Sequence, residues 1–219
     1  MELNGKKILF IGDSITEGVG VSHIDKVYWN LVAQKTGATC IGYGLSGTRI
    51  ARQYDLHENY FSGTHYYVTR LADMDKEADA IGIFGGTNDF GHGDAPLGTM
   101  DDRTADTFYG GMHELCIKLF EQYPQAQLVV MTPTHRLSED EVVFNELGLR
   151  RVAPLKRYVE IIKEVAEYYS IPVLDLYAVS GIQPKVPVMQ ERYMPDGLHP
   201  NDAGHEILAD KLIGFFKTI

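Results

Sequence analysis

The chain has 219 residues, 44% of them hydrophobic and 23% charged, and its formal net charge at pH 7 is -10. These values are typical of a soluble globular protein, and the length suits a single domain spanning residues 1–219. The acidic balance argues against nucleic acid as a partner, because a phosphate backbone selects basic surfaces. No apolar run is long enough to cross a membrane, so we expect no membrane partner.

The first residues of the chain are polar and lead directly into an apolar segment, without the apolar core of a secretion signal. We therefore expect a cytoplasmic protein, unless a leader was removed from the natural chain. Cys40 and Cys116 stand between apolar neighbours, which favours buried thiols over a disulfide or a metal site. The histidines lack metal-ligand spacing as well, so the sequence predicts no metal centre.

Short apolar runs bounded by turn residues recur along the chain and predict the buried strands of a parallel sheet. The five runs are Ile8–Ile11, Ala38–Ile41, Ala80–Phe84, Leu128–Met131 and Ile171–Asp175. Apolar residues at helical spacing predict helices over residues 26–36, 67–75, 105–123, 152–169 and 202–217. This alternation indicates an α/β protein of three layers, with helices on both faces of a five-stranded parallel sheet.

Residues 52–67 are rich in tyrosine and histidine and have no clear periodicity. Long loops of this kind are often binding loops or lids. Tyr54 and Tyr60 could line a pocket, stack on a sugar or form the interface of a homo-oligomer. Simple packing of the loop onto the core explains the composition equally well, so the sequence leaves these alternatives open.

Residues suited to acyl transfer follow several of the predicted strands. Ser14 follows the first strand, Gly47 the second and Asn88 the third. Asp196 and His199 lie between the fifth strand and the last helix. Because parallel strands all end at the same edge of a sheet, these residues should converge.

Such a cluster would support nucleophilic catalysis. His199 would remove the proton of the Ser14 hydroxyl, and Asp196, three residues from His199, would orient the imidazole ring. The backbone N–H groups of Ser14 and Gly47 and the side-chain amide of Asn88 would stabilise an oxyanion. Each residue also has a structural explanation, such as a helix cap at Ser14 or a turn at Asn88. Their shared position at one sheet edge favours the catalytic interpretation.

Four blocks of sequence, in this order, resemble the SGNH (GDSL-type) hydrolase family. The blocks are Gly12-Asp13-Ser14, Leu45-Ser46-Gly47-Thr48, Gly86-Thr87-Asn88-Asp89 and Asp196-Gly197-Leu198-His199-Pro200. The resemblance spans residues 8 to 210. It departs at Ile41-Gly42-Tyr43, where members of the family often carry an asparagine that is not catalytic.

The resemblance implies a flavodoxin-like fold and a serine esterase that uses neither a metal nor an organic cofactor. It further implies that Ser14 is the nucleophile, His199 the base and Asp196 its orienting carboxylate. Gly47 and Asn88 would join the Ser14 amide in the oxyanion hole.

The substrate is less constrained than the reaction. Aromatic residues with few aliphatic ones in residues 52–67 favour a sugar over a long acyl chain. We therefore expect an esterase of short-chain carboxylic esters that removes O-acetyl groups from a carbohydrate. The alternatives are a lysophospholipase or thioesterase, and a catalytically silent binding protein. Arg49 and Arg136 follow the second and fourth strands and are candidates for polar contacts with the substrate, or for solvated loop residues.

Overall fold

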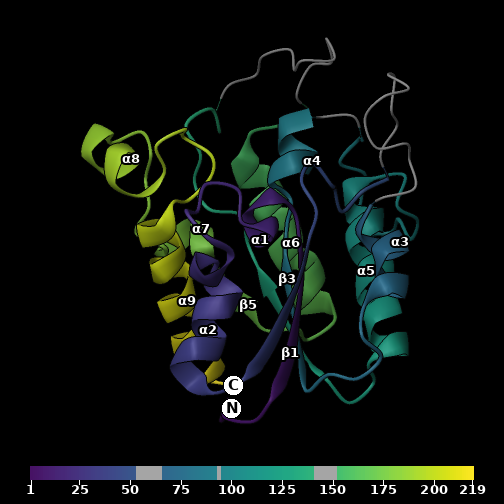
Figure 1. Cartoon of the computed structure of the whole chain (residues 1–219). Helices are drawn as coiled ribbons and strands as arrows, with labels where there is room; N and C mark the ends of the chain where they lie inside the picture. Colours follow the sequence, from purple (N-terminus) through teal and green to yellow (C-terminus); the bar gives the residue numbers. More distant parts are fainter. Residues whose placement is uncertain (53–65, 93–94, 141–151) are drawn as a thin grey trace.

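The computed structural model describes residues 1–52, 66–92, 95–140 and 152–219. Within these residues, five strands form one sheet in the order β2-β1-β3-β4-β5, which is the strand order of flavodoxin-like folds. All neighbouring strands are parallel, so the predicted α/β architecture is confirmed (Figure 1). The strands are β1 (Lys7–Gly12), β2 (Thr39–Gly44), β3 (Ala80–Phe84), β4 (Gln127–Met131) and β5 (Val173–Leu174).

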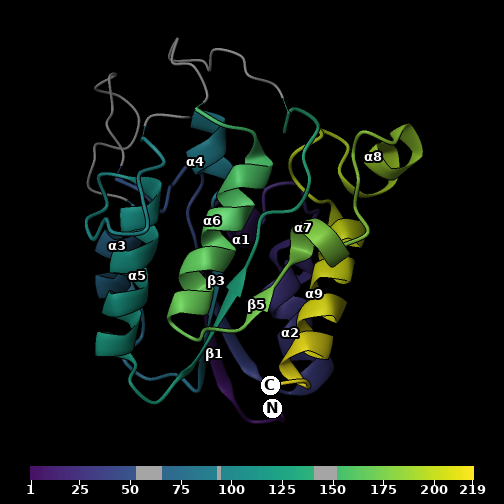
Figure 2. The same cartoon turned by 180° about the vertical axis from the view of Figure 1, so that it is seen from behind.

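Helices cover both faces of this sheet, as the two opposite views show (Figures 1 and 2). One face carries α2 (Tyr28–Thr36) and α9 (Asp202–Phe216), and the other carries α3 (Tyr67–Arg70), α5 (Phe108–Gln122) and α6 (Leu155–Tyr168). Shorter helices follow strands or precede the last helix: α1 (Ser14–Glu17), α4 (Thr87–His92), α7 (Leu176–Val179) and α8 (Pro187–Tyr193). No helix in the described ranges is long and apolar enough to cross a membrane.

Two apolar cores lie on the two faces of the sheet, because successive strand residues point to opposite sides. Leu9 and Ile81 face the core that includes α5 and α6. Phe10 and Val129 face the core that includes α2 and α9. All four side chains are fully buried. The long apolar runs that predicted buried strands therefore reflect a sheet that is covered on both faces.

Three predicted helices begin later than expected. A 3-10 turn at Ile24–Lys26 precedes α2, and Thr107 caps α5 by accepting a 3.0 Å hydrogen bond from the Gly110 amide. Pro154 precedes α6 and fixes its start. Val152, which we expected on the apolar face of this helix, therefore lies outside it and is 50% exposed. The predicted helix over residues 67–75 is shorter, with α3 continuing into a 3-10 turn to Asp73.

The second strand extends beyond its predicted end, and its glycines allow helix α1 to approach closely. A Cβ atom on Gly44 would lie 2.0 Å from the backbone nitrogen of Glu17. A Cβ atom on Gly42 would meet the ring of Trp29 at 2.3 Å. The sequence prediction ended this strand at Ile41, before both glycines. They belong to the strand, and glycine is needed there because a neighbouring element occupies the space of a side chain.

Candidate active site

The first three strands end at the same level of the sheet. Gly12, the last residue of β1, pairs in register with Gly44 of β2 and with Phe84 of β3. Ser14, Gly47 and Asn88 follow these strand ends closely along the chain. The side-chain amide of Asn88 donates a 3.2 Å hydrogen bond to the Thr48 carbonyl, which joins the loop after β3 to the loop after β2.

Ser14 is the first residue of α1 and is 7% exposed. The chain can turn sharply here because the Asp13 side chain caps the helix, accepting a 3.0 Å hydrogen bond from the Ile15 amide. The structure therefore assigns the capping role to Asp13. The sequence left Ser14 open as a possible cap, but its hydroxyl contacts the ring of His199 instead.

Asp196 and His199 form a compact turn before α9. One carboxylate oxygen of Asp196 accepts hydrogen bonds from the Leu198 amide at 2.8 Å and the His199 amide at 2.7 Å. The other oxygen lies 2.7 Å from His199 Nδ1. Burial would raise the pKa of Asp196, but the hydrogen bonds from His199 and Leu198 outweigh it and hold this pKa below its usual value.

The histidine ring connects this turn to the serine. His199 Nε2 lies 3.0 Å from Ser14 Oγ, although the two residues are 185 positions apart in the chain. With Nδ1 protonated and facing the carboxylate, Nε2 is the acceptor for the serine hydroxyl hydrogen. The three side chains that the sequence singled out thus form one continuous relay of hydrogen bonds.

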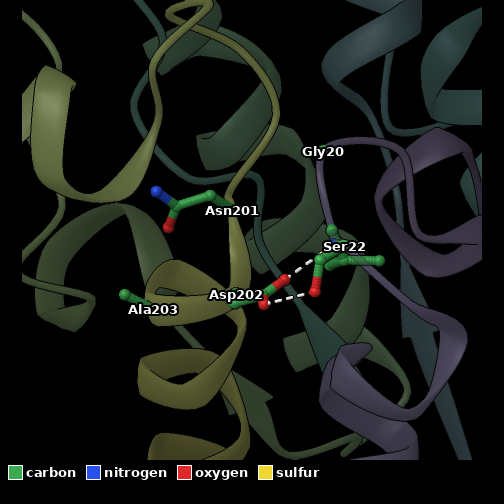
Figure 3. A pocket seen from close by; sticks show the side chains of 6 residues that line it. Gly20, Ser22, Asn201, Asp202 and Ala203 are labelled. Carbon is green, nitrogen blue, oxygen red and sulfur yellow. Dashed lines mark hydrogen bonds between the residues drawn. The ribbon is translucent and has the colours of Figure 1, made fainter.

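Contacts around the turn hold the histidine in this position. Leu137, after β4, donates its amide hydrogen to the Gly197 carbonyl at 2.8 Å. Ser22 donates from its amide and its hydroxyl to the Asp202 carboxylate, at 2.8 and 2.6 Å, at the start of α9 (Figure 3). Figure 3 also shows the surface pocket beside these residues, lined in part by Gly20 and Asn201. Sequence reasoning missed these contacts, because long-range backbone partners leave no local motif.

The loop after β2, which contains Gly47, is held by contacts from two other segments. Gly47 has a φ of +76°, a conformation that favours glycine. Ser46 donates from its amide, at 2.7 Å, and from its hydroxyl to the Glu17 carboxylate at the end of α1. Buried Asp89 accepts hydrogen bonds from the Ile50 amide at 3.1 Å and the Ala51 amide at 2.9 Å. The side chain of Glu17, in α1, therefore fixes one end of this loop, and the side chain of Asp89, in α4, fixes the other.

Asp13 places a buried carboxyl group next to Ser14 in the chain. It is 2% exposed, and burial raises its pKa to about 6, against the opposing effects of the Ile15 amide, His199 and Arg70. Near neutral pH the group is ionised, at an energetic cost to the folded state. The carboxylate lies within electrostatic reach of His199.

The predicted substrate-binding residues are less clearly placed at the site. Arg49 is buried, with 3% of its surface exposed. Arg136 donates to the carbonyl and hydroxyl oxygens of Thr87, at 3.1 and 3.2 Å, and lies over the ring of Phe90. Through these contacts Arg136 stabilises the start of α4. Substrate contact by either arginine stays a prediction. Tyr54 and Tyr60 lie outside the described residues.

A parallel α/β sheet with a serine, histidine and aspartate joined at its carboxyl edge is typical of the serine hydrolases. A model of the GDSL-like Lipase/Acylhydrolase family matches residues 10–207. The chain belongs to this family, the SGNH hydrolases, and is a carboxylic ester hydrolase. In the described part of the chain, no group of histidine, cysteine or acidic residues could hold a metal ion.

Solved structures share this fold over the whole chain. One crystal structure shares 36% sequence identity with a TM-score of 0.86, covering 100% of this chain and 99% of its own. A protein from Lactobacillus plantarum shares 30% identity with a TM-score of 0.81, covering 99% and 98%. A two-domain esterase (CEX) active on acetylated mannans shares 20% identity with a TM-score of 0.61, covering 99% of this chain and 49% of that one. A search of curated proteins found no match.

Proposed function

We propose that this protein hydrolyses short-chain carboxylic esters through an acyl-enzyme formed on Ser14. The observation that carries the proposal is the continuous contact from Ser14 Oγ to His199 Nε2, at 3.0 Å, and from His199 Nδ1 to Asp196, at 2.7 Å. Both distances lie within the range in which a base accepts a proton from a nucleophile and is itself oriented by a carboxylate.

In the proposed reaction, Ser14 Oγ attacks the ester carbonyl while His199 Nε2 takes its proton. The resulting imidazolium is stabilised by Asp196, whose lowered pKa keeps it ionised. His199 then gives the proton to the leaving alcohol, and the acyl group stays on Ser14. Water, deprotonated by His199, attacks this acyl-enzyme; the bond between the acyl carbon and Ser14 Oγ breaks, His199 returns the proton to Oγ, and the carboxylic acid leaves.

The oxyanion of each tetrahedral intermediate would be held by the Ser14 and Gly47 amides and the Asn88 side chain. Asn88 supports this role because its amide nitrogen carries two hydrogens, one of which is directed at the Thr48 carbonyl. The carbonyl fixes the amide plane, and the second hydrogen would then serve the substrate. One such donor typically contributes about 3 kcal/mol of transition-state stabilisation.

For the substrate, we propose an O-acetyl group on a carbohydrate. The aromatic composition of residues 52–67 supports a sugar, and the fold is shared with an esterase active on acetylated mannans. A lysophospholipase or thioesterase would instead prefer long acyl chains. Turnover of p-nitrophenyl esters should fall from acetate to octanoate, and a steady rise with chain length would refute the acetyl-ester proposal in favour of the alternative.

Labelling with a fluorophosphonate probe tests the catalytic proposal directly. We expect one label per wild-type chain, and none on Ser14→Ala. His199→Ala should label far more slowly because the serine loses its base. Ser138→Ala, which changes another serine near a strand end, should label like the wild type. Undiminished labelling of Ser14→Ala would refute the mechanism, and an unlabelled wild type would support a silent binding protein.

A further inference from the structure

Arg70, the last residue of α3, reaches into the edge of the sheet beneath the proposed active site. It is 8% exposed, and its Nη1 atom donates to the Gly12 carbonyl at 2.9 Å and to the Thr48 hydroxyl at 2.8 Å. Its Nη2 atom donates to the Tyr43 carbonyl. One guanidinium therefore bonds to the end of β1, the end of β2 and the loop that follows β2.

The third strand is connected to the same group through an aromatic ring. The Arg70 guanidinium lies 5.4 Å from the ring centre of Tyr67, one turn earlier in α3. The Tyr67 hydroxyl donates a 2.7 Å hydrogen bond to the carbonyl of Phe84, the last residue of β3. Helix α3 thus delivers two side chains that together contact the ends of all three strands carrying the proposed catalytic blocks.

The contacts of Arg70 lie close to each proposed oxyanion donor. The Gly12 carbonyl precedes the Asp13-Ser14 turn, and Thr48 directly follows Gly47. The Thr48 hydroxyl, besides accepting from Arg70, donates to the Leu45 carbonyl at 2.8 Å and so closes the loop around Gly47. The Thr48 carbonyl accepts from Asn88. A displacement of Arg70 would therefore move all three donors relative to one another.

Burying this guanidinium is unfavourable for folding alone. Burial lowers the pKa of Arg70, which shows that its charge is costly in this place. Its acceptors in the described part of the chain are two carbonyl oxygens and a hydroxyl. A buried cation that bonds neutral acceptors loses hydration that these bonds return only in part, and the charges of Asp13 and Glu17 offset part of this cost. What the guanidinium provides is a rigid, planar set of donors that contacts three segments at once.

We propose that Arg70 is a positioning residue of the esterase reaction, which sets the spacing of the Ser14 and Gly47 amides and of Asn88 for the oxyanion. This inference rests on the proposed function. Arg70 does not itself contact the ester. It acts by fixing the positions of the oxyanion donors. Transition-state stabilisation depends on these positions, since a displacement near 1 Å reduces the rate by about 100-fold.

Three variants test this role on p-nitrophenyl acetate. Arg70→Met removes all three hydrogen bonds at similar volume, and Arg70→Lys keeps the charge but not the planar set of donors. Thr48→Val removes one acceptor of Arg70, together with the hydrogen bond from that hydroxyl to the Leu45 carbonyl. Arg157→Met is the control. Arg157 likewise makes several hydrogen bonds, to the Tyr109 hydroxyl and the Glu164 carboxylate, but it lies on the outer helix α6. Turnover is measured per active site, counted by fluorophosphonate titration, so that loss of folded protein does not affect the result.

We expect kcat to fall about 10- to 100-fold in Arg70→Met with KM changed less than about twofold, because the donors act on the transition state more than on the bound ester. Arg70→Lys should recover part of this loss, and Thr48→Val should lose about 3- to 10-fold. Arg157→Met should keep the wild-type kcat. If Arg70→Met does not fold, Thr48→Val alone decides the question.

A wild-type kcat per active site in Arg70→Met, or in Thr48→Val where only that variant folds, would overturn the inference and leave the esterase proposal intact. A rise in KM with unchanged kcat would also overturn it, since it would place Arg70 in substrate binding. If instead Ser14→Ala labels and turns over like the wild type, the esterase mechanism fails, and the positioning role fails with it. The two failures are therefore distinguishable.

Discussion

Replacing Asp13 by asparagine should stabilise the protein at neutral pH and reduce its activity. Asp13 is almost fully buried, and burial raises its pKa from 3.8 to about 6. A pKa difference of one between the folded and unfolded states corresponds to about 1.4 kcal/mol, so the ionised carboxylate destabilises the folded state by about 3 kcal/mol above pH 6. Asparagine carries no charge, and its side-chain oxygen can accept the same hydrogen bond from the Ile15 amide.

The pH dependence follows from proton binding in the two states. Below about pH 4 the carboxyl is neutral in both, and the variant should match the wild type. Between about pH 4 and 6 the folded wild type binds more protons than the unfolded chain, so its stability falls as pH rises relative to Asp13→Asn. The variant should therefore gain up to about 3 kcal/mol by pH 8. Urea denaturation at pH 4, 5, 6 and 8 measures the difference.

Activity should change in the opposite direction. The Asp13 carboxylate interacts favourably with a positive charge on His199, and such a charge develops in the proposed transition state. We expect kcat at pH 8 to fall about tenfold in Asp13→Asn, which corresponds to about 1.4 kcal/mol. Asp102→Asn is the control, because hydrogen bonds from Thr99 and Thr107 lower the pKa of Asp102 and its loss should destabilise the protein at pH 8. A pH-independent stability difference for Asp13→Asn would refute the reasoning.

Three further predictions concern the donors and a buried histidine. Asn88→Ala should lower kcat about 100- to 1000-fold with little change in KM, as steady-state kinetics would show. Gly47→Ala and Gly181→Ala should lose similar stability, about 1 kcal/mol each, because both glycines have φ of +76° and open space at Cβ. Only Gly47→Ala should lower kcat, because a change in its backbone conformation would move the Gly47 amide; equal kcat values would show that catalysis does not depend on that conformation. Burial lowers the pKa of His205 to about 4, so its contribution to stability is lost as pH falls from about 6.5 to 4. His205→Asn, which keeps an acceptor for the Tyr28 amide, should flatten that slope in urea titrations, and an unchanged slope would contradict the assignment.

The parts of the site that follow strand ends could be predicted from sequence because the topology brings them together. Once the apolar runs indicate parallel strands, Ser14, Gly47 and Asn88 must lie at one edge. The Asp196–His199 contact is local, spanning three residues, and a turn of that length allows it. Neither inference requires knowledge of side-chain packing.

Arg70 could not be found in the same way. Its acceptors include the carbonyls of Gly12 and Tyr43, and any residue supplies a carbonyl, so the sequence carries no mark of the contact. The extent of β2 was missed for a related reason. A glycine such as Gly44 is typical of a loop. Here it is part of the strand, and only glycine fits because α1, which ends 27 residues earlier in the chain, approaches its backbone closely.

The Asp196 carboxylate both folds its turn and orients the histidine, since it accepts from two backbone amides and faces the ring nitrogen. Base and carboxylate consequently move as one body. A shift of the backbone behind this turn therefore changes the separation between the ring and Ser14, while the contact between the ring and its carboxylate stays intact. Substitutions in α8 or α9 can thus change how often the serine and the histidine meet without separating the histidine from Asp196.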